Sequence, residues 1–165
     1  MTSNEMIKIL EQSRAEILAL VNAEFDKMKA LISNDEQKSE PLQLSVDIPL
    51  LSNGSLFKGK KPLCILFENG EVQDTLSWKK VAKILLEKCR SNPETNKRLG
   101  EICGLISGKN RILFGWDSSE MNYPIEVDGM YLETKLDTET LMNVLVKRIL
   151  IPAGFDGRGV SIKVR

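Results

Sequence analysis

Residues 63–89 read LCILFENGEVQDTLSWKKVAKILLEKC, and this stretch decides the fold class. Two strand-like runs, Leu63–Phe67 and Glu71–Thr75, flank an Asn-Gly pair, which is the strongest short signal of a β-hairpin. Ser77 is a good helix N-cap, and apolar residues then recur at helical spacing. A hairpin followed directly by an amphipathic helix predicts an α+β domain.

The residues after this stretch continue the mixture of helices and strands. A second helix is predicted from Asn92, with Pro93 in its first turn and Gly108 as its stop. The remaining predicted elements are strands at Arg111–Phe114, Met130–Thr134 and Val160–Val164, and a helix capped by Asp137 or Thr138 and ended by Pro152. The order β-β-α-α-β-β-α-β favours a small antiparallel or mixed sheet covered by helices.

The N-terminal residues predict one long amphipathic helix. Neither Gly nor Pro occurs from Glu5 to Ile32, and apolar residues repeat every three or four positions. Two rows repeat at seven-residue intervals, interrupted by Arg14 and Glu24: Ile7, Val21 and Met28 in one row, and Leu10, Ile17 and Leu31 in the other. This pattern is typical of a coiled coil, so residues 1–32 are predicted to form a homo-oligomer. The alternative is that the helix packs back on its own domain.

Residues 33–55 separate this helix from the predicted domain. They open with polar residues, contain Pro41 and Pro49, and show no sustained period. We predict a linker with one short strand around Leu42 to Ile48, and a compact domain over residues 56–165.

The amino-acid composition limits the class of protein to which the chain can belong. The chain is 42% hydrophobic and 28% charged, which is ordinary for a globular protein. It lacks both a run of about 18 apolar residues and a signal peptide, so no membrane association is expected. The three cysteines, Cys64, Cys89 and Cys103, are odd in number and lie on apolar faces, which indicates reduced buried thiols and a cytoplasmic protein.

The absence of histidine excludes triad hydrolases and histidine-based zinc sites. No cofactor is expected.

Charge is distributed unevenly along the chain. Residues 1–55 carry five basic and nine acidic side chains, whereas the remainder carries 18 basic and 14 acidic ones. A mildly basic domain behind an acidic helix is compatible with a polyanionic partner.

Basic residues gather in two predicted loop or edge regions, before the hairpin and at the C-terminus. If the first and last strands of the domain are neighbours, these groups form one positive surface near Lys109 and Arg111, with Trp116 or Tyr123 available for stacking on bases. The other candidate binding residues are Lys58, Lys60, Lys61, Arg158, Lys163 and Arg165. The alternative is that any domain with 18 basic residues shows such groups by chance.

Two segments resemble catalytic motifs only in part. GLISGKN at 104–110 is one residue too short for a phosphate loop and follows a predicted helix where a strand is needed. Glu133 and Lys135 form an E-x-K triplet which, with Asp117 or Asp128, would suit a magnesium-dependent nuclease. We predict that Glu133 and Lys135 lie on a solvated rim without a second carboxylate nearby, and that the protein has neither catalytic nor metal-binding residues.

Four segments together resemble a known but functionally uncharacterised module of bacterial and phage proteins: LFKGKKP at 56–62, LSWKKV around Trp78, GMYLETKLDTETL at 129–141 and AGFDGRGVSIKV at 153–164. This module is found behind a helical stalk or joined to restriction and phage-defence proteins. The resemblance implies a biological setting and no particular reaction.

The hypothesis that joins these observations is a non-catalytic, homo-oligomeric binding protein with nucleic acid as the preferred partner. A second hypothesis is a phage-type inhibitor that engages a host defence protein or sequesters a nucleotide signal. A third is the metal-dependent nuclease.

Overall fold

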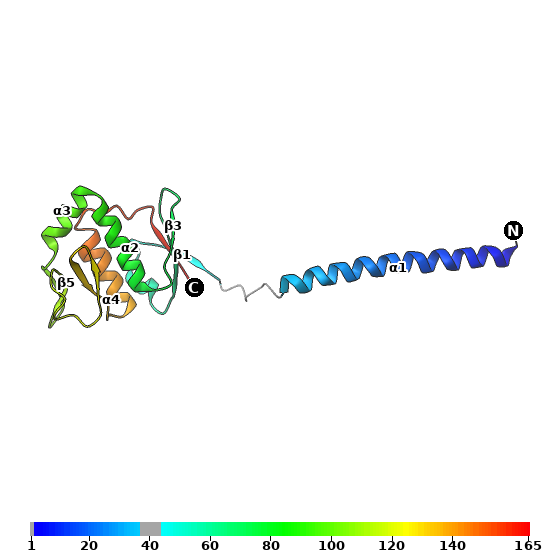
Figure 1. The fold of residues 1–165 in the computed structure, drawn as a ribbon, viewed down its shortest axis with the longest axis horizontal. Helices are drawn as coiled ribbons and strands as arrows, with labels where there is room; N and C mark the ends of the chain where they lie inside the picture. Colours follow the sequence, from blue (N-terminus) through cyan, green and yellow to red (C-terminus); the bar gives the residue numbers. More distant parts are fainter. Residues whose placement is uncertain (1, 37–43) are drawn as a thin grey trace. The chain divides into compact units, whose positions relative to one another are not determined.

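The computed structural model divides the chain into two units, residues 1–43 and 44–165 (Figure 1). It describes residues 2–36 and 44–165, with side chains described for 2–30 and 44–165. Each unit is treated by itself below.

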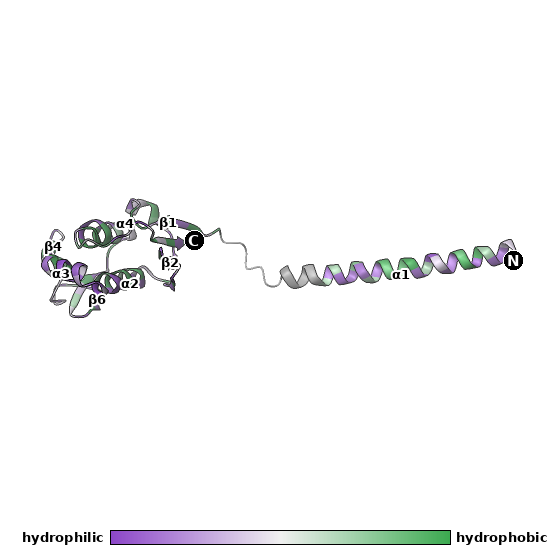
Figure 2. Ribbon diagram, turned by 90° about the horizontal axis from the view of Figure 1, so that it is seen from above, coloured by the Kyte–Doolittle hydropathy of each residue, from purple (hydrophilic) through white to green (hydrophobic). Residues whose placement is uncertain are grey.

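The first unit is one helix, α1 (Ser3–Glu36), which confirms the long helix predicted from sequence. Thr2 and Glu5 cap its start reciprocally: the Glu5 backbone N–H donates to Thr2 Oγ1 (3.3 Å) and the Thr2 N–H donates to Glu5 Oε2 (2.7 Å). Apolar and polar bands alternate along α1 (Figure 2). The large apolar side chains within residues 3–30 are exposed, including Leu10 (69%) and Phe25 (56%). None of the helices within the described ranges is long and apolar enough to cross a membrane.

The second unit contains two four-stranded antiparallel sheets, so it is an α+β domain as predicted. The first sheet has the order β1-β8-β2-β3, made of β1 (Val46–Pro49), β8 (Ser161–Val164), β2 (Pro62–Leu66) and β3 (Val72–Asp74). Residues 67–71 connect β2 to β3, which confirms the predicted hairpin. β8 lies between β1 and β2, so the closing strand is central to this sheet.

The second sheet has the order β4-β5-β7-β6. It consists of β4 (Ile106–Ser107), β5 (Ile112–Gly115), β7 (Met130–Glu133) and β6 (Pro124–Val127). A tight turn at Asp128 and Gly129 joins β6 to β7, and both residues have positive φ angles (45° and 82°). The sequence predicted one sheet because short strands do not reveal which of them pair.

Three helical segments surround a shared core in this unit. They are α2 (Trp78–Ser91), α3 (Pro93–Ile102), and α4 (Thr138–Asn143), which continues as a π-helical segment, η2 (Val144–Leu150). Ser77, Asn92 and Asp137 cap the three starts with their side-chain oxygens. Ser77 was predicted as a cap and Asp137 as one of two candidates, whereas Asn92 was predicted only as the start of its helix. A short 3-10 helix, η1 (Gly54–Phe57), contributes the fully buried Phe57, whose ring meets that of Trp78 edge-on at 5.5 Å.

The end of α3 differs from the prediction. The helix ends at Ile102 and not at Gly108, because Gly104 adopts a positive φ of 93° and its N–H donates to the Phe114 carbonyl (3.0 Å). The chain therefore leaves the helix early, and Ile106 joins the second sheet in β4.

The compact unit also begins earlier than predicted, at Leu44 and not at residue 56. β1 pairs with β8, and Leu50 is fully buried with its N–H bonded to the Val160 carbonyl (2.8 Å). The segment resembles a linker in sequence because Pro49 and the Ser-Asn-Gly turn interrupt its apolar pattern. Residues 37–43 of the predicted linker lie outside the described residues.

Candidate functional site

The exposed ring of Tyr123 on the compact unit has two ammonium groups nearby. Lys79 Nζ lies 5.7 Å and Lys135 Nζ 5.4 Å from the centre of the Tyr123 ring, and 57% of Tyr123 is exposed. The three residues come from the start of α2, the β5–β6 loop and the residues after β7. We call Lys79, Tyr123 and Lys135 the Tyr123 cluster. An exposed aromatic ring with two cations beside it is a combination that single-strand-binding proteins use to hold a base and its phosphates.

A buried carboxylate fixes the backbone of this cluster. Glu133 is fully buried, and its oxygens accept backbone N–H bonds from Asn122 (2.6 Å), Tyr123 (3.0 Å) and Lys135 (2.8 Å). Arg111 Nε lies 3.6 Å from Glu133 Oε2. Burial raises the pKa of Glu133, but the three backbone hydrogen bonds and the Arg111 charge outweigh it, so the net pKa is lowered. The ionised carboxylate therefore holds the loops that carry Tyr123 and Lys135.

The prediction that Glu133 lies on a solvated rim was wrong. Glu133 ends β7 and points inward, where its charge is compensated by the backbone donors and Arg111; Lys135 is exposed as predicted. The carboxylates that a nuclease would need have other partners. Asp117 accepts from Ser119 N (2.9 Å) and Oγ (2.8 Å), and Asp128 Oδ2 pairs with Arg90 Nε (3.0 Å).

No group of three or more potential metal ligands occurs within residues 2–36 and 44–165. Through its backbone hydrogen bonds, Glu133 of the E-x-K triplet positions the Tyr123 loop.

The GLISGKN segment contains β4 and opens the turn to β5, where Lys109 and the following Arg111 are two further basic residues. Gly108 N–H donates to the Arg111 carbonyl (2.8 Å), which closes the turn between β4 and β5, so the segment is not a phosphate loop. A hollow of about 380 Å³ is lined by Gly108, Lys109, Asn110, Arg111, Leu113, Leu136 and Thr140. The charged residues of this lining, Lys109 and Arg111, are both basic. Arg111 also pairs with Glu133, which holds the backbone of the Tyr123 cluster.

The loop before β2 approaches the same elements. Trp78 Nε1 donates to the Lys60 carbonyl (2.9 Å), which brings Lys60 next to the start of α2. Hydrogen bonds from Thr140 lower the pKa of Asp137, and the charge of Lys58 adds to this effect, so Lys58 lies near the start of α4. We define the basic surface as the Tyr123 cluster together with Lys58, Lys60, Lys109 and Arg111.

The other residues predicted for the site are divided between two ends of β8. The predicted neighbours β2 and β8 do pair, and Lys61 and Arg165 exchange two backbone hydrogen bonds of 3.0 Å at one end. Arg158 precedes the opposite end and is held by both oxygens of Asp156 (3.0 and 3.1 Å), while Lys163 lies 3.8 Å from Asp47. These ion pairs reduce the positive potential of the C-terminal group.

Trp116 is 55% exposed but does not belong to the Tyr123 cluster. Its ring lies beside α3, where a Cβ placed on Gly100 would be 4.0 Å from Trp116 Cζ2. Two aromatic residues of one loop thus face different helices.

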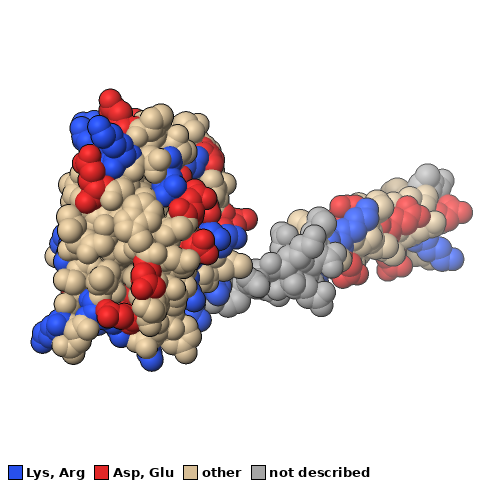
Figure 3. Space-filling view, turned by 60° about the vertical axis from the view of Figure 1, so that its left-hand side comes forward, with Lys and Arg blue, Asp and Glu red and all other residues tan. Residues whose placement is uncertain are grey.

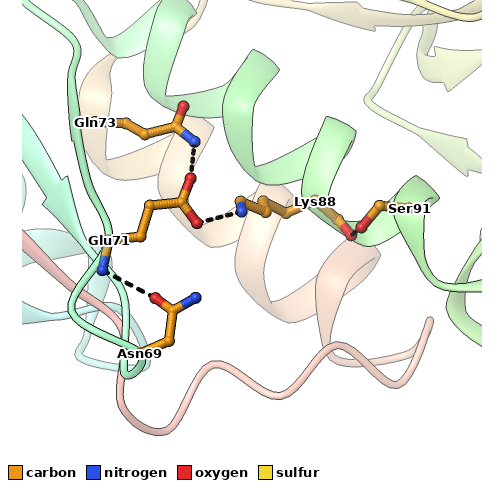
Figure 4. A network of polar contacts seen from close by, with 5 residues as sticks. All are labelled: Asn69, Glu71, Gln73, Lys88 and Ser91. Atoms are coloured by element: carbon orange, nitrogen blue, oxygen red, sulfur yellow. Dashed lines mark hydrogen bonds and ion pairs between the residues drawn. The ribbon is translucent and has the colours of Figure 1, made fainter.

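A second hollow, of about 430 Å³, has the opposite electrostatic character. Lys88 Nζ pairs with Glu71 Oε2 (2.5 Å) and lies 4.8 Å from the centre of the Phe67 ring, and Gln73 and Asn69 also bond to Glu71 (Figure 4). The remaining lining residues are Glu68, Phe155, Asp156 and Val160. Three carboxylates against one ammonium disfavour a nucleotide in this hollow.

Positive and negative side chains are interspersed on the face of this unit drawn in Figure 3. Charge sign therefore varies locally, and the basic surface is defined by its residues and not by a uniformly positive face.

Comparison with known proteins found no matching family model, and no significantly similar curated protein or solved structure. The argument for function therefore depends on the site itself.

The sequence does not indicate that Lys79 and Lys135 lie beside Tyr123. Lys79 belongs to a predicted helix and Lys135 to the E-x-K triplet, and they are 44 and 12 residues from Tyr123 in the chain. The exposed tyrosine itself was predicted correctly as an accessible aromatic residue.

Proposed function

We propose that this protein is a non-catalytic, homo-oligomeric nucleic-acid-binding protein. Each compact unit binds through the basic surface, and α1 associates the copies. The observation that carries the proposal is the exposed Tyr123 ring with the ammonium groups of Lys79 and Lys135 at 5.7 and 5.4 Å from its centre.

The chemistry of this cluster favours a single strand over a duplex. Stacking on a tyrosine ring requires a base whose face is free, whereas the surrounding ammonium and guanidinium groups attract phosphates of any sequence. The Glu133 hydrogen bonds hold the Tyr123 backbone before the ligand arrives, which reduces the entropy lost on binding.

Oligomerisation would raise the affinity of a modest site. Several weakly binding copies on one particle engage one strand with an increased effective concentration. The exposed apolar side chains of α1 support self-association, and the resemblance to a module of phage and restriction proteins supports nucleic acid as the partner. The three buried, free cysteines suit a reducing cytoplasm.

Two charge reversals in the cluster test the proposal. In K79E/K135E, the affinity for a fluorescent 20-nucleotide single strand at low salt is expected to fall at least about tenfold, because each reversal removes one phosphate contact and adds a repulsion. The measurement is fluorescence anisotropy. The matched control is K97E/R158E, which reverses two exposed charges outside the basic surface.

Tyr123 variants separate stacking from charge. Y123A is expected to lose about 5- to 150-fold in affinity, which corresponds to about 1–3 kcal/mol per stacked base, whereas Y123F keeps the ring and most of the affinity. If K79E/K135E and its control lose affinity equally, or if the parent protein does not bind the strand, nucleic acid is not the partner. The alternative, an inhibitor that engages a host defence protein, then takes its place.

A further inference from the structure

Two charged residues interrupt the apolar rows of α1, and the contacts described for residues 2–30 do not account for both of them. In the seven-residue repeat, Arg14 replaces an apolar residue in the row of Ile7, Val21 and Met28, and Glu24 replaces one in the row of Leu10 and Ile17. Glu24 has an ion pair with Lys27 (2.8 Å), but both side chains are about two-thirds exposed or more, so this pair contributes little. A charge inside a coiled-coil seam specifies how the helices align.

The contacts of Arg14 and Glu24 differ between a parallel and an antiparallel pair of helices. In a parallel pair, residues of one row face the same row of the second helix, so Arg14 meets Arg14 and Glu24 meets Glu24. In an antiparallel pair, each row faces the other row. Arg14 can then face Glu24 of the second copy, and this happens twice because the arrangement is two-fold symmetric.

The offset that pairs the charges also pairs the apolar residues. With Arg14 opposite Glu24 of the second copy, Ile17 lies opposite Val21 and Leu10 lies opposite Met28. The same offset places Ser3 opposite position 35, and the helix spans Ser3–Glu36, so the two helices overlap along their full length. The apolar matches follow from the two seven-residue rows, so the Arg14–Glu24 pairing is compatible with a continuous apolar seam.

We propose that α1 pairs with α1 of a second copy in an antiparallel orientation, with two reciprocal ion pairs between Arg14 and Glu24. This inference rests on the self-association that the proposed function contains and adds the partner face and its direction. It predicts that the C-terminal ends of the two helices lie at opposite ends of the pair.

A distance between labels on the full-length chain tests the orientation. Asn4 lies opposite position 34 of the second copy, which is 30 residues from its own Asn4, so spin labels on N4C are expected about 45 Å apart at 1.5 Å per residue. A parallel pair would place them within about 20 Å. The parent chain treated with the same label is the control, because Cys64, Cys89 and Cys103 are buried and free.

Charge exchange provides a second measurement that does not depend on labels. R14E alone and E24R alone are each expected to weaken dimerisation about tenfold or more in sedimentation equilibrium, and R14E/E24R is expected to restore it to within about threefold, because the exchanged charges attract again. In a parallel pair all three variants would replace one like-charge contact by another and would dimerise alike.

The outcomes distinguish this inference from the proposed function. A short label distance, or single variants that dimerise as the parent does, overturns the antiparallel pair and leaves an oligomeric nucleic-acid-binding protein. A monomeric parent chain overturns both the pair and the self-association, whereas the Tyr123 variants still report on nucleic-acid binding.

Discussion

Glu133 is the residue on which the geometry of the site depends. E133Q is expected to destabilise the protein by about 1–3 kcal/mol at pH 7, because the amide nitrogen would face backbone N–H donors and leave one of them unsatisfied. Urea unfolding measures this loss. The exposed strand residue Glu126 provides the control, and E126Q is expected to change stability by less than about 0.5 kcal/mol.

The pH dependence of this difference has a definite sign. The folded-state pKa of Glu133 is lowered from its ordinary value of 4.5, so its stabilising contribution is fully present above pH 4.5 and is lost as the pH falls through the folded-state pKa. The gap between the parent and E133Q should therefore close on acidification. A gap that stays constant from pH 7 to pH 3 would mean that the carboxylate charge is not what stabilises the loop.

Only part of this residue-level arrangement could be predicted from the sequence. Tyr123 was found because aromatic residues in turn-rich segments tend to remain accessible, and Lys109 and Arg111 were found as a basic pair. Glu133 was misassigned because its burial depends on three backbone N–H groups from the β5–β6 loop and from Lys135, and on Arg111 from the β4–β5 turn. Contacts between segments so far apart in the chain leave no repeating pattern in the sequence.

At the level of elements, β1 decides where the folded domain begins. A chain of residues 44–165 is expected to unfold cooperatively, whereas residues 56–165, which start at the boundary predicted from sequence, should be strongly destabilised. The shorter chain loses the pairing of β1 with β8 and the buried side chains of Ile48 and Leu50, each worth about 2–5 kcal/mol. Circular dichroism during heating compares the two chains.

Single substitutions in residues 44–165 provide the control for this truncation. L50A removes a fully buried side chain and should lower stability by about 2–5 kcal/mol, whereas L51A removes one that is 43% exposed and should cost much less. If residues 56–165 melt at the same temperature as residues 44–165, β1 is an accessory strand.

Helix starts were predicted accurately, whereas of the strand pairings only the β2–β3 hairpin and the neighbourhood of β2 and β8 were anticipated. Ser77, Asn92 and Asp137 identify their helices because an N-cap interaction is local. β4 was missed because its two residues lie within the expected extent of the preceding helix, and β6 because it begins with Pro124 in a turn-rich segment. The early end of α3 was missed for a similar reason, since the hydrogen bond from Gly104 goes to β5.

For the whole molecule, the number of binding units on one particle should determine how affinity varies with strand length. The full chain is expected to bind a strand of about 60 nucleotides about 10- to 100-fold more tightly than residues 44–165 do, because a second unit binds at high effective concentration. On a strand of about 10 nucleotides, which holds one unit, the two proteins should bind alike. Equal affinities on both strands would show that α1 does not contribute to avidity.

Salt provides an independent measurement on the same proteins. For single strands the slope of log affinity against log salt is about −0.7 for each phosphate neutralised, so K79E/K135E should flatten the slope of residues 44–165 by about 1.4. The full chain should show a steeper slope than residues 44–165 on the longer strand only.

The three buried thiols can report local opening of the folded domain. Cys64 lies in β2, Cys89 in α2 and Cys103 after α3, and burial raises the pKa of each thiol, that of Cys103 to about 11. A sulfhydryl reagent added to the native protein can therefore react at an appreciable rate only during a transient opening that hydrates the thiol. If the three thiols react at equal rates, the two sheets open together as one cooperative unit. If Cys103 reacts faster, the region around the second sheet opens while the first sheet remains closed.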